Sequence, residues 1–96
     1  MKKEKIGNCC VDSGQLMVCD PCYIEQEWGE EEKSTFNYQG ASDVTLPKKS
    51  HGSMKFRMGH EGAGVAFATY GDGTYPVYAE RGANGLIKRV IIKLHE

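Results

Sequence analysis

The second half of the chain alternates apolar and polar residues with the period of a β-strand. Met54, Phe56 and Met58 alternate with basic residues, which is typical of a strand with one buried face. Three later apolar runs are bounded by glycine-rich or Asn-Gly turn signals. The predicted strands span 54–58, 65–70, 75–78 and 86–94, and the predicted turns lie at 59–64, 71–73 and 84–85. We therefore expect a four-stranded antiparallel meander. Pro76 has no N–H to donate, so its strand is expected at a sheet edge or an irregularity.

The N-terminal third contains two short apolar runs around a turn sequence. The runs at 9–11 and 16–18 flank Asp-Ser-Gly-Gln at 12–15, and Asp, Ser and Gly favour turn geometry. This arrangement predicts a β-hairpin. With a two-residue turn, one face of the hairpin would face the core and would carry Cys9, Val11, Leu16 and Val18.

A short helix is predicted directly after this hairpin. Asp20 can cap a helix and Pro21 suits its first turn. Ile24 and Trp28 then lie one turn apart, so the helix is expected to span about 21–28 and to pack Trp28 onto the sheet. The segment 34–53 is expected to contribute one or two short edge strands.

Length and composition favour one domain over residues 1–96. A single core usually occupies roughly 100–150 residues, and 40% hydrophobic with 26% charged residues is an ordinary globular composition. The predicted fold class is mostly β: an antiparallel meander, small sandwich or open barrel with one short helix near 21–28.

The charge pattern limits the partners. The formal net charge is −1, which provides no general attraction to DNA, RNA or an anionic membrane. The glutamates at 25–32 form an acidic run, and no segment has the roughly 18 apolar residues of a membrane span. No signal-peptide pattern follows the basic start, so we expect a cytoplasmic protein.

The four cysteines are then expected to be thiols or metal ligands rather than disulfides. Cys19 and Cys22 have the spacing of a redox or zinc pair, but a redox motif needs a βαβ setting that this pattern lacks. Zinc would need Cys10, brought near by the hairpin, and a fourth ligand from His51, His60 or His95. Small buried free thiols are the favoured interpretation, and no cofactor is predicted.

The glycine-rich segments do not carry a known catalytic motif. The segment 59–64 lacks the pattern of a phosphate-binding loop, although successive glycine amides can bind an anion. No GxSxG, HExxH or dinucleotide fingerprint occurs, so an enzyme is not favoured.

Aromatic and basic side chains suit stacking on a ring or binding a phosphate. The candidate ligand-binding residues of this kind are Trp28, Arg57, His60, Tyr75, Tyr78, Arg81 and Arg89.

Two strings resemble the signatures of a family of small uncharacterised bacterial and phage proteins. The segment 11–23 resembles its "DSGQL…DPCY" signature, and the segment 71–78 resembles its "GDGxYPVY" strand. The resemblance implies one intact domain and a bacterial or phage origin. It implies no catalytic residue.

Two functions are carried forward. The first is a non-enzymatic binding protein for a small anionic or nucleotide-like molecule. If the source is a phage, the protein is expected to sequester a host signalling molecule of this kind. The small size of the chain favours a homodimer. The alternative is a protein-interaction module that binds and inhibits a host enzyme through the acidic run or the strand edge near Pro76. A metal-assisted hydrolase is less favoured.

Overall fold

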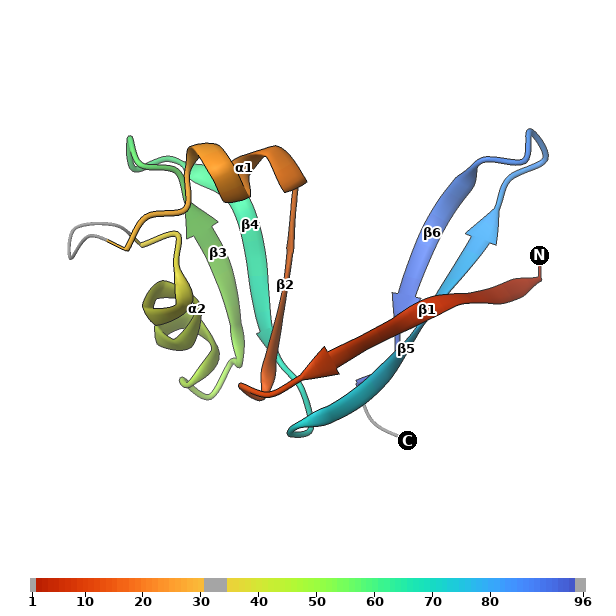
Figure 1. The fold of residues 1–96 in the computed structure, drawn as a ribbon, viewed down its shortest axis with the longest axis horizontal. Helices are drawn as coiled ribbons and strands as arrows, with labels where there is room; N and C mark the ends of the chain where they lie inside the picture. The colour runs from red at the N-terminus through yellow and green to blue at the C-terminus, as the bar shows by residue number, and fades with distance from the viewer. Residues whose placement is uncertain (1, 31–34, 95–96) are drawn as a thin grey trace. The chain divides into compact units, whose positions relative to one another are not determined.

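The computed structural model describes residues 2–30 and 35–94, and it is mostly β, as predicted (Figure 1). Two compact units divide the chain. We call them the terminal unit, which comprises Met1–Gly14 and Thr69–Glu96, and the central unit, Gln15–Ala68. Each contains one three-stranded antiparallel sheet. The elements are β1 (Lys3–Val11), β2 (Gln15–Cys19), α1 (Pro21–Gln26), α2 (Tyr38–Thr45), β3 (His51–Lys55), β4 (Glu61–Ala68), β5 (Gly73–Arg81) and β6 (Ile87–Ile92). No helix among the described residues is long and apolar enough to cross a membrane.

The sheet of the terminal unit has the strand order β1-β5-β6, so β5 is central. Cys9 pairs with Tyr75, and Val77 pairs with Ile92. Side chains alternate between the two faces of such a sheet. The face that includes Tyr75 and Ala79 holds the buried residues, and Val11 at the end of β1 is buried with them.

The predicted turn at 84–85 is confirmed as the tip of the β5–β6 hairpin (Figure 1). Gly85 has φ +84°, a conformation that favours glycine. The Leu86 amide donates to Asn84 Oδ1 over 3.1 Å, and the Gly82 amide donates to the Leu86 carbonyl over 2.8 Å. This local hydrogen bonding shapes the tip of the hairpin.

The sheet of the central unit has the order β2-β4-β3, and one of its faces carries the core. Met17 lies opposite Ala66, and Met54 lies opposite Gly64, so these four residues share that face. Side chains from both helices and from the segments beside them pack on this face. The buried core cluster comprises Phe36, Ala41, Met54, Ala63 and Ala66. The partly buried residues packed against it are Met17, Cys19, Tyr23, Trp28, Val44 and Phe56.

The short helix predicted after the second strand is confirmed as α1. Asp20 is its N-cap and accepts from the Cys22 amide over 3.0 Å, and Pro21 occupies the first turn. The helix ends at Gln26, before Trp28. The Trp28 ring packs edge-on against Phe36 at 5.4 Å between centroids, so Trp28 belongs to the core of this unit.

The prediction of edge strands in 34–53 is wrong for its first part, because helix α2 occupies Tyr38–Thr45. Asn37 caps this helix by accepting from the Gly40 amide over 2.8 Å. A Cβ atom on Gly40 would lie only 1.7 Å from the Thr35 carbonyl oxygen, so glycine is required there. Strand β3 does begin within the predicted segment, at His51.

The predicted N-terminal hairpin is wrong, because β1 pairs with β5 and β2 pairs with β4. On β2 the core face carries Met17 and Cys19, whereas Val18 is 58% exposed.

The predicted four-stranded meander is also wrong as one sheet. Its first and last hairpins form, but they belong to different sheets, since β4 and β5 do not pair.

Candidate functional site

A pocket lies in the terminal unit beside β5, and we call it the β5 pocket. Its volume is about 550 Å³, which is within the usual range of small-ligand sites. The turn before β5, β5 itself and the segment after β6 supply its walls. The lining residues are Tyr70, Asp72, Gly73, Thr74, Tyr75, Pro76, Tyr78 and Lys93.

The turn before β5 is held by hydrogen bonds to one carbonyl. Gly71 has φ +121°, and its carbonyl accepts from the Thr69 hydroxyl over 2.8 Å and from the Tyr75 hydroxyl over 2.7 Å. The Tyr70 amide donates to the Leu94 carbonyl over 3.3 Å. This last bond places Tyr70 beside the segment that carries Lys93, and so forms one end of the pocket.

Tyr75 therefore acts mainly by fixing this turn, and Tyr75→Phe should lower the free energy of unfolding by about 1 kcal/mol, the usual contribution of one hydrogen bond. Its hydroxyl bonds the Gly71 carbonyl, and the residue is 8% exposed. Urea unfolding followed by circular dichroism measures the loss. Tyr38→Phe, at a residue that is 60% exposed, is the matched control and should change stability little. Equal losses in both variants would contradict this role.

Two ammonium groups lie beside the Tyr78 ring. The Lys3 Nζ is 4.6 Å from the ring centroid, and the Lys93 Nζ is 5.5 Å from it. Both distances fit cation–π contacts. Lys3 belongs to β1 and Lys93 follows β6, so the sheet brings together residues from the two ends of the sequence.

The pKa of Lys3 lies below its usual value. The main cause is the neighbouring Lys93 side chain, followed by desolvation and by Coulomb repulsion from Lys93, while Glu80 acts in the opposite direction. Two neighbouring positive charges disfavour each other. A bound anion would remove this repulsion.

The polar groups of the pocket differ between its two ends. Asp72 precedes β5, and Tyr78 lies on the second half of the strand. Of the two lysines beside the Tyr78 ring, Lys93 is a lining residue of the pocket and Lys3 is not. Between Asp72 and Tyr78, the Thr74 hydroxyl lies 3.8 Å from the Cys10 thiol. The pocket therefore offers positive charge at one end and a carboxylate at the other.

Pro76 also lines this pocket. The sequence suggests a sheet edge or an irregularity at this residue, and the ladder is interrupted there although β5 is not an edge strand. Strand β5 has neighbours on both sides, and Pro76 pairs with Asn8 of β1. The ladder with β6 starts only at Val77, however. Strand β5 thus has a single neighbour at Pro76, which explains how the missing N–H is tolerated.

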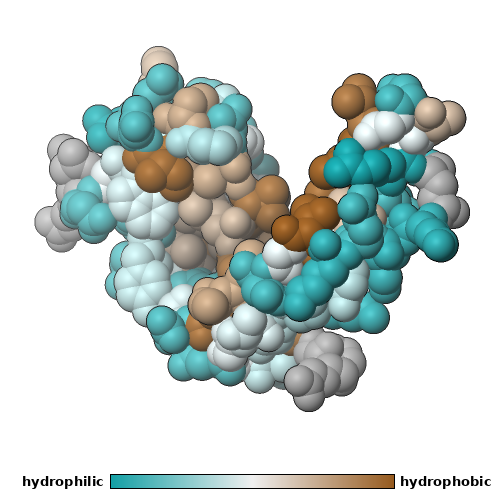
Figure 2. Space-filling model, turned by 45° about the vertical axis from the view of Figure 1, so that its right-hand side comes forward, coloured by the Kyte–Doolittle hydropathy of each residue, from teal (hydrophilic) through white to brown (hydrophobic). Residues whose placement is uncertain are grey.

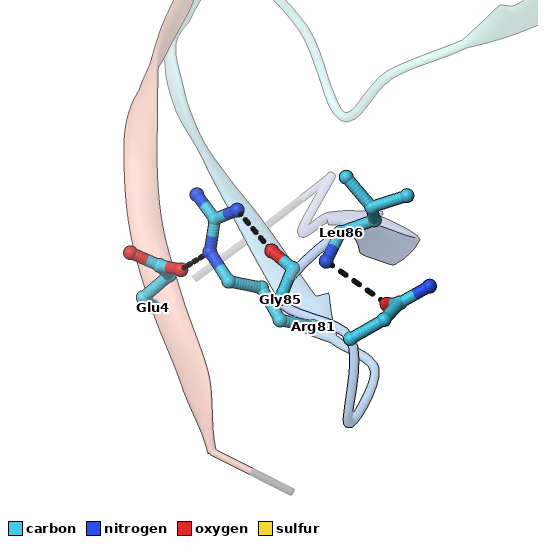
Figure 3. A network of polar contacts seen from close by, with 5 residues as sticks. Glu4, Arg81, Gly85 and Leu86 are labelled. Atoms are coloured by element: carbon cyan, nitrogen blue, oxygen red, sulfur yellow. Dashed lines mark hydrogen bonds and ion pairs between the residues drawn. The ribbon is translucent and has the colours of Figure 1, made fainter.

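Four of the predicted binding residues belong to the terminal unit. Tyr75 and Tyr78 line the pocket. Arg81 donates to Glu4 Oε1 over 2.6 Å and to the Gly85 carbonyl over 2.8 Å, so it connects β1 to the hairpin tip (Figure 3). Arg89 is paired with Glu80 at 3.2 Å. Neither arginine is among the pocket's lining residues.

The other three predicted residues belong to the central unit. Arg57 Nη2 donates to the Trp28 carbonyl over 3.4 Å, and the Arg57 amide donates to Glu27 Oε1 over 2.9 Å. His60 stacks on Phe56 with ring centroids 4.5 Å apart. These contacts join the β3–β4 turn to the end of α1, which is a structural arrangement.

The sequence analysis missed Tyr70, Lys3 and Lys93 as site residues. Tyr70 is 80% exposed and follows an apolar run, where only its place before the Gly-Asp-Gly turn singles it out. The lysines meet only because β1 pairs with β5. The expected hairpin of the first two strands excluded that pairing.

The hairpin on which the open zinc site depended does not form. The favoured interpretation of buried thiols is wrong, because Cys10 and Cys22 are exposed and Cys9 and Cys19 are half-buried. Strands β1 and β2 lie in different sheets, so the hairpin register that would bring Cys10 toward Cys19 is absent. Within residues 2–30 and 35–94, no three His, Cys, Asp or Glu side chains are grouped to hold a metal, and His95 lies outside the described residues. The Asp20 carboxylate, hydrogen-bonded to Cys22, raises the pKa of that thiol, which disfavours a reactive thiolate.

No family model matches this chain, and no curated protein or solved structure matches it either. The resemblance to the bacterial and phage family therefore stays a prediction.

Proposed function

We propose that this protein is a non-enzymatic binding protein whose β5 pocket holds a small anionic, nucleotide-like molecule. The observation that carries the proposal is the pair of ammonium groups, Lys3 and Lys93, over Tyr78 at a cavity of about 550 Å³. Ammonium groups are common phosphate ligands in proteins. The cavity is formed by one chain, so the proposal does not require the homodimer that small size favours.

The aromatic residues provide a surface for a planar ring. Tyr78 carries the two ammonium groups, and Tyr70, which is 80% exposed, lines the same pocket together with Pro76. Stacking on an exposed aromatic ring is a frequent mode of base binding. The proposed ligand therefore places its phosphate at Lys3 and Lys93 and its base on Tyr70.

A binding role also agrees with the chemistry of the pocket. Its ionisable lining residues are Asp72, Lys93 and tyrosines, with no histidine or cysteine among them. Sequestration requires tight binding and slow release and no stabilisation of a transition state. The family resemblance supports a phage source, in which such binding would remove a host signalling nucleotide.

Nucleotide binding can be tested on the purified full chain by thermal shift and isothermal titration calorimetry. The panel consists of AMP, GMP, CMP and UMP, and at least one should stabilise the protein, since a ligand that binds only the folded state adds to its stability. Lys93→Gln should weaken that binding about tenfold through loss of a charge-assisted contact. Lys88→Gln, an equal charge change on β6 away from the pocket, should leave it unchanged.

Two results would overturn the proposal. One is a panel in which no nucleotide raises the melting temperature or releases heat. The other is an equal loss of affinity in Lys93→Gln and Lys88→Gln, which would mean that binding depends on general charge and not on the pocket.

The protein-interaction alternative is favoured by one observation. Strand β6 is an edge of its sheet, and apolar residues at and before it are exposed: Leu86 by 67%, Val90 by 57% and Ile87 by 44%. Figure 2 shows apolar surface on this hairpin, in the upper right of the view. An exposed strand edge can accept a strand of a partner. The site first expected near Pro76 lies on the central strand β5, which has only β1 as a neighbour at that residue, and part of the acidic run lies outside the described residues.

A further inference from the structure

We infer that the β5 pocket selects the doubly charged phosphate of a nucleoside monophosphate over the singly charged phosphodiester of a cyclic nucleotide. The inference rests on the proposed function and names its ligand class. It follows from the number and the placement of the charges around Tyr78.

The two ammonium groups are close enough to bind one phosphate group together. The Lys3 Nζ and the Lys93 Nζ lie 4.6 and 5.5 Å from the centroid of the same Tyr78 ring. A terminal phosphate presents three oxygens and up to two negative charges, whereas a phosphodiester has one charge and two non-bridging oxygens. Two adjacent ammonium groups therefore match the terminal phosphate in charge.

The neighbouring charged groups keep the surroundings of Tyr78 positive. On β5 and β6, the Glu80 carboxylate is paired with Arg89 at 3.2 Å. On β1, Lys5 pairs in register with Tyr78 and adds positive charge on the same face. Asp72 lies before β5, toward the other end of the pocket, where it disfavours an anion and can accept from a ribose hydroxyl.

Binding should also be coupled to proton uptake. The pKa of Lys3 is lowered chiefly by Lys93, and a doubly charged anion between the two groups opposes that effect. The pKa of Lys3 is then higher in the complex than in the free protein, so binding takes up protons at a pH near these pKa values. Affinity should fall as the pH rises through the lowered pKa of Lys3, and it should also fall below about pH 6, where a phosphate monoester loses its second charge.

The experiment compares AMP with 3′,5′-cyclic AMP, which carry the same base, by calorimetry on the full chain. We expect AMP to bind about tenfold more tightly, because it supplies the second charge. Lys3→Gln and Lys93→Gln should each reduce this preference to about onefold, and Lys88→Gln should retain it. Inorganic phosphate should compete with AMP. Repeating the AMP titration at a pH near the lowered pKa of Lys3, in buffers of different ionisation enthalpy, should reveal net proton uptake.

The outcomes separate the two proposals. Equal or tighter binding of cyclic AMP, or a preference that persists in both lysine variants, would overturn the inference and leave the proposed function standing. Absence of binding by every nucleotide would overturn the proposed function itself. Lys3 and Lys93 are both exposed, so circular dichroism of the variants should match that of the original protein and confirm that they fold.

Discussion

Met54→Ala is expected to lower the free energy of unfolding of the central unit by about 3 kcal/mol, within the usual range for a buried methionine. Met54 is 1% exposed and lies in β3 opposite Gly64, in the middle of the core cluster. Alanine removes most of the side chain, and the glycine beside it cannot fill the space. The cost combines lost apolar burial with the cavity that remains.

The measurement is denaturant unfolding followed by tryptophan fluorescence. Trp28 is the sole tryptophan of the chain and packs against the same core, so its emission reports on this unit. Met58→Ala is the matched control: Met58 is 91% exposed, and its loss should change stability by less than about 0.5 kcal/mol. A small effect at Met54, or a similar one at both positions, would contradict the assignment of the core.

Features that depend on neighbouring residues were predictable from the sequence. Asp20 and Pro21 define the start of α1, and Asn84-Gly85 defines the β5–β6 hairpin, because capping and turn preferences act over a few residues. The mostly β content followed from alternating apolar positions. These signals do not depend on which strands pair.

The strand pairing was not predictable, because it depends on distant parts of the chain. The turn sequence at 12–15 is typical of a hairpin, yet the chain passes there from one sheet to the other. Likewise, 71–73 connects β4 to β5 in different sheets. A turn signal shows where the chain bends and does not show which strands join.

The candidate site was predictable only in part, for the same reason. Tyr75 and Tyr78 lie in a recognisable strand and do line the pocket. Lys3 looked like one residue of a solvated basic start, and its place beside Tyr78 follows from the β1–β5 register. Three of the predicted residues, Trp28, Arg57 and His60, instead make contacts within the central unit.

Helix α2 illustrates how tertiary contacts can outweigh local propensity. Gly40, Val44 and Thr45 are poor helix formers, so the sequence pattern did not indicate a helix. The helix forms because its cap is built from buried groups: Asn37 is 6% exposed, accepts from the Gly40 amide and donates to the Gly29 carbonyl over 2.6 Å. One side chain thus joins α2 to the segment after α1.

Asn37→Ala should consequently lower the free energy of unfolding of the central unit by about 3 kcal/mol, since it leaves two buried backbone groups without their partner. Asn37→Ser retains an oxygen that can accept from the Gly40 amide but cannot reach the Gly29 carbonyl, and it should lose about half as much. Asn8→Ala, at an exposed position on β1, is the control and should be nearly neutral. Trp28 fluorescence again follows the unfolding. If alanine and serine cost the same, the cap contributes nothing, and the bond to Gly29 alone supports α2.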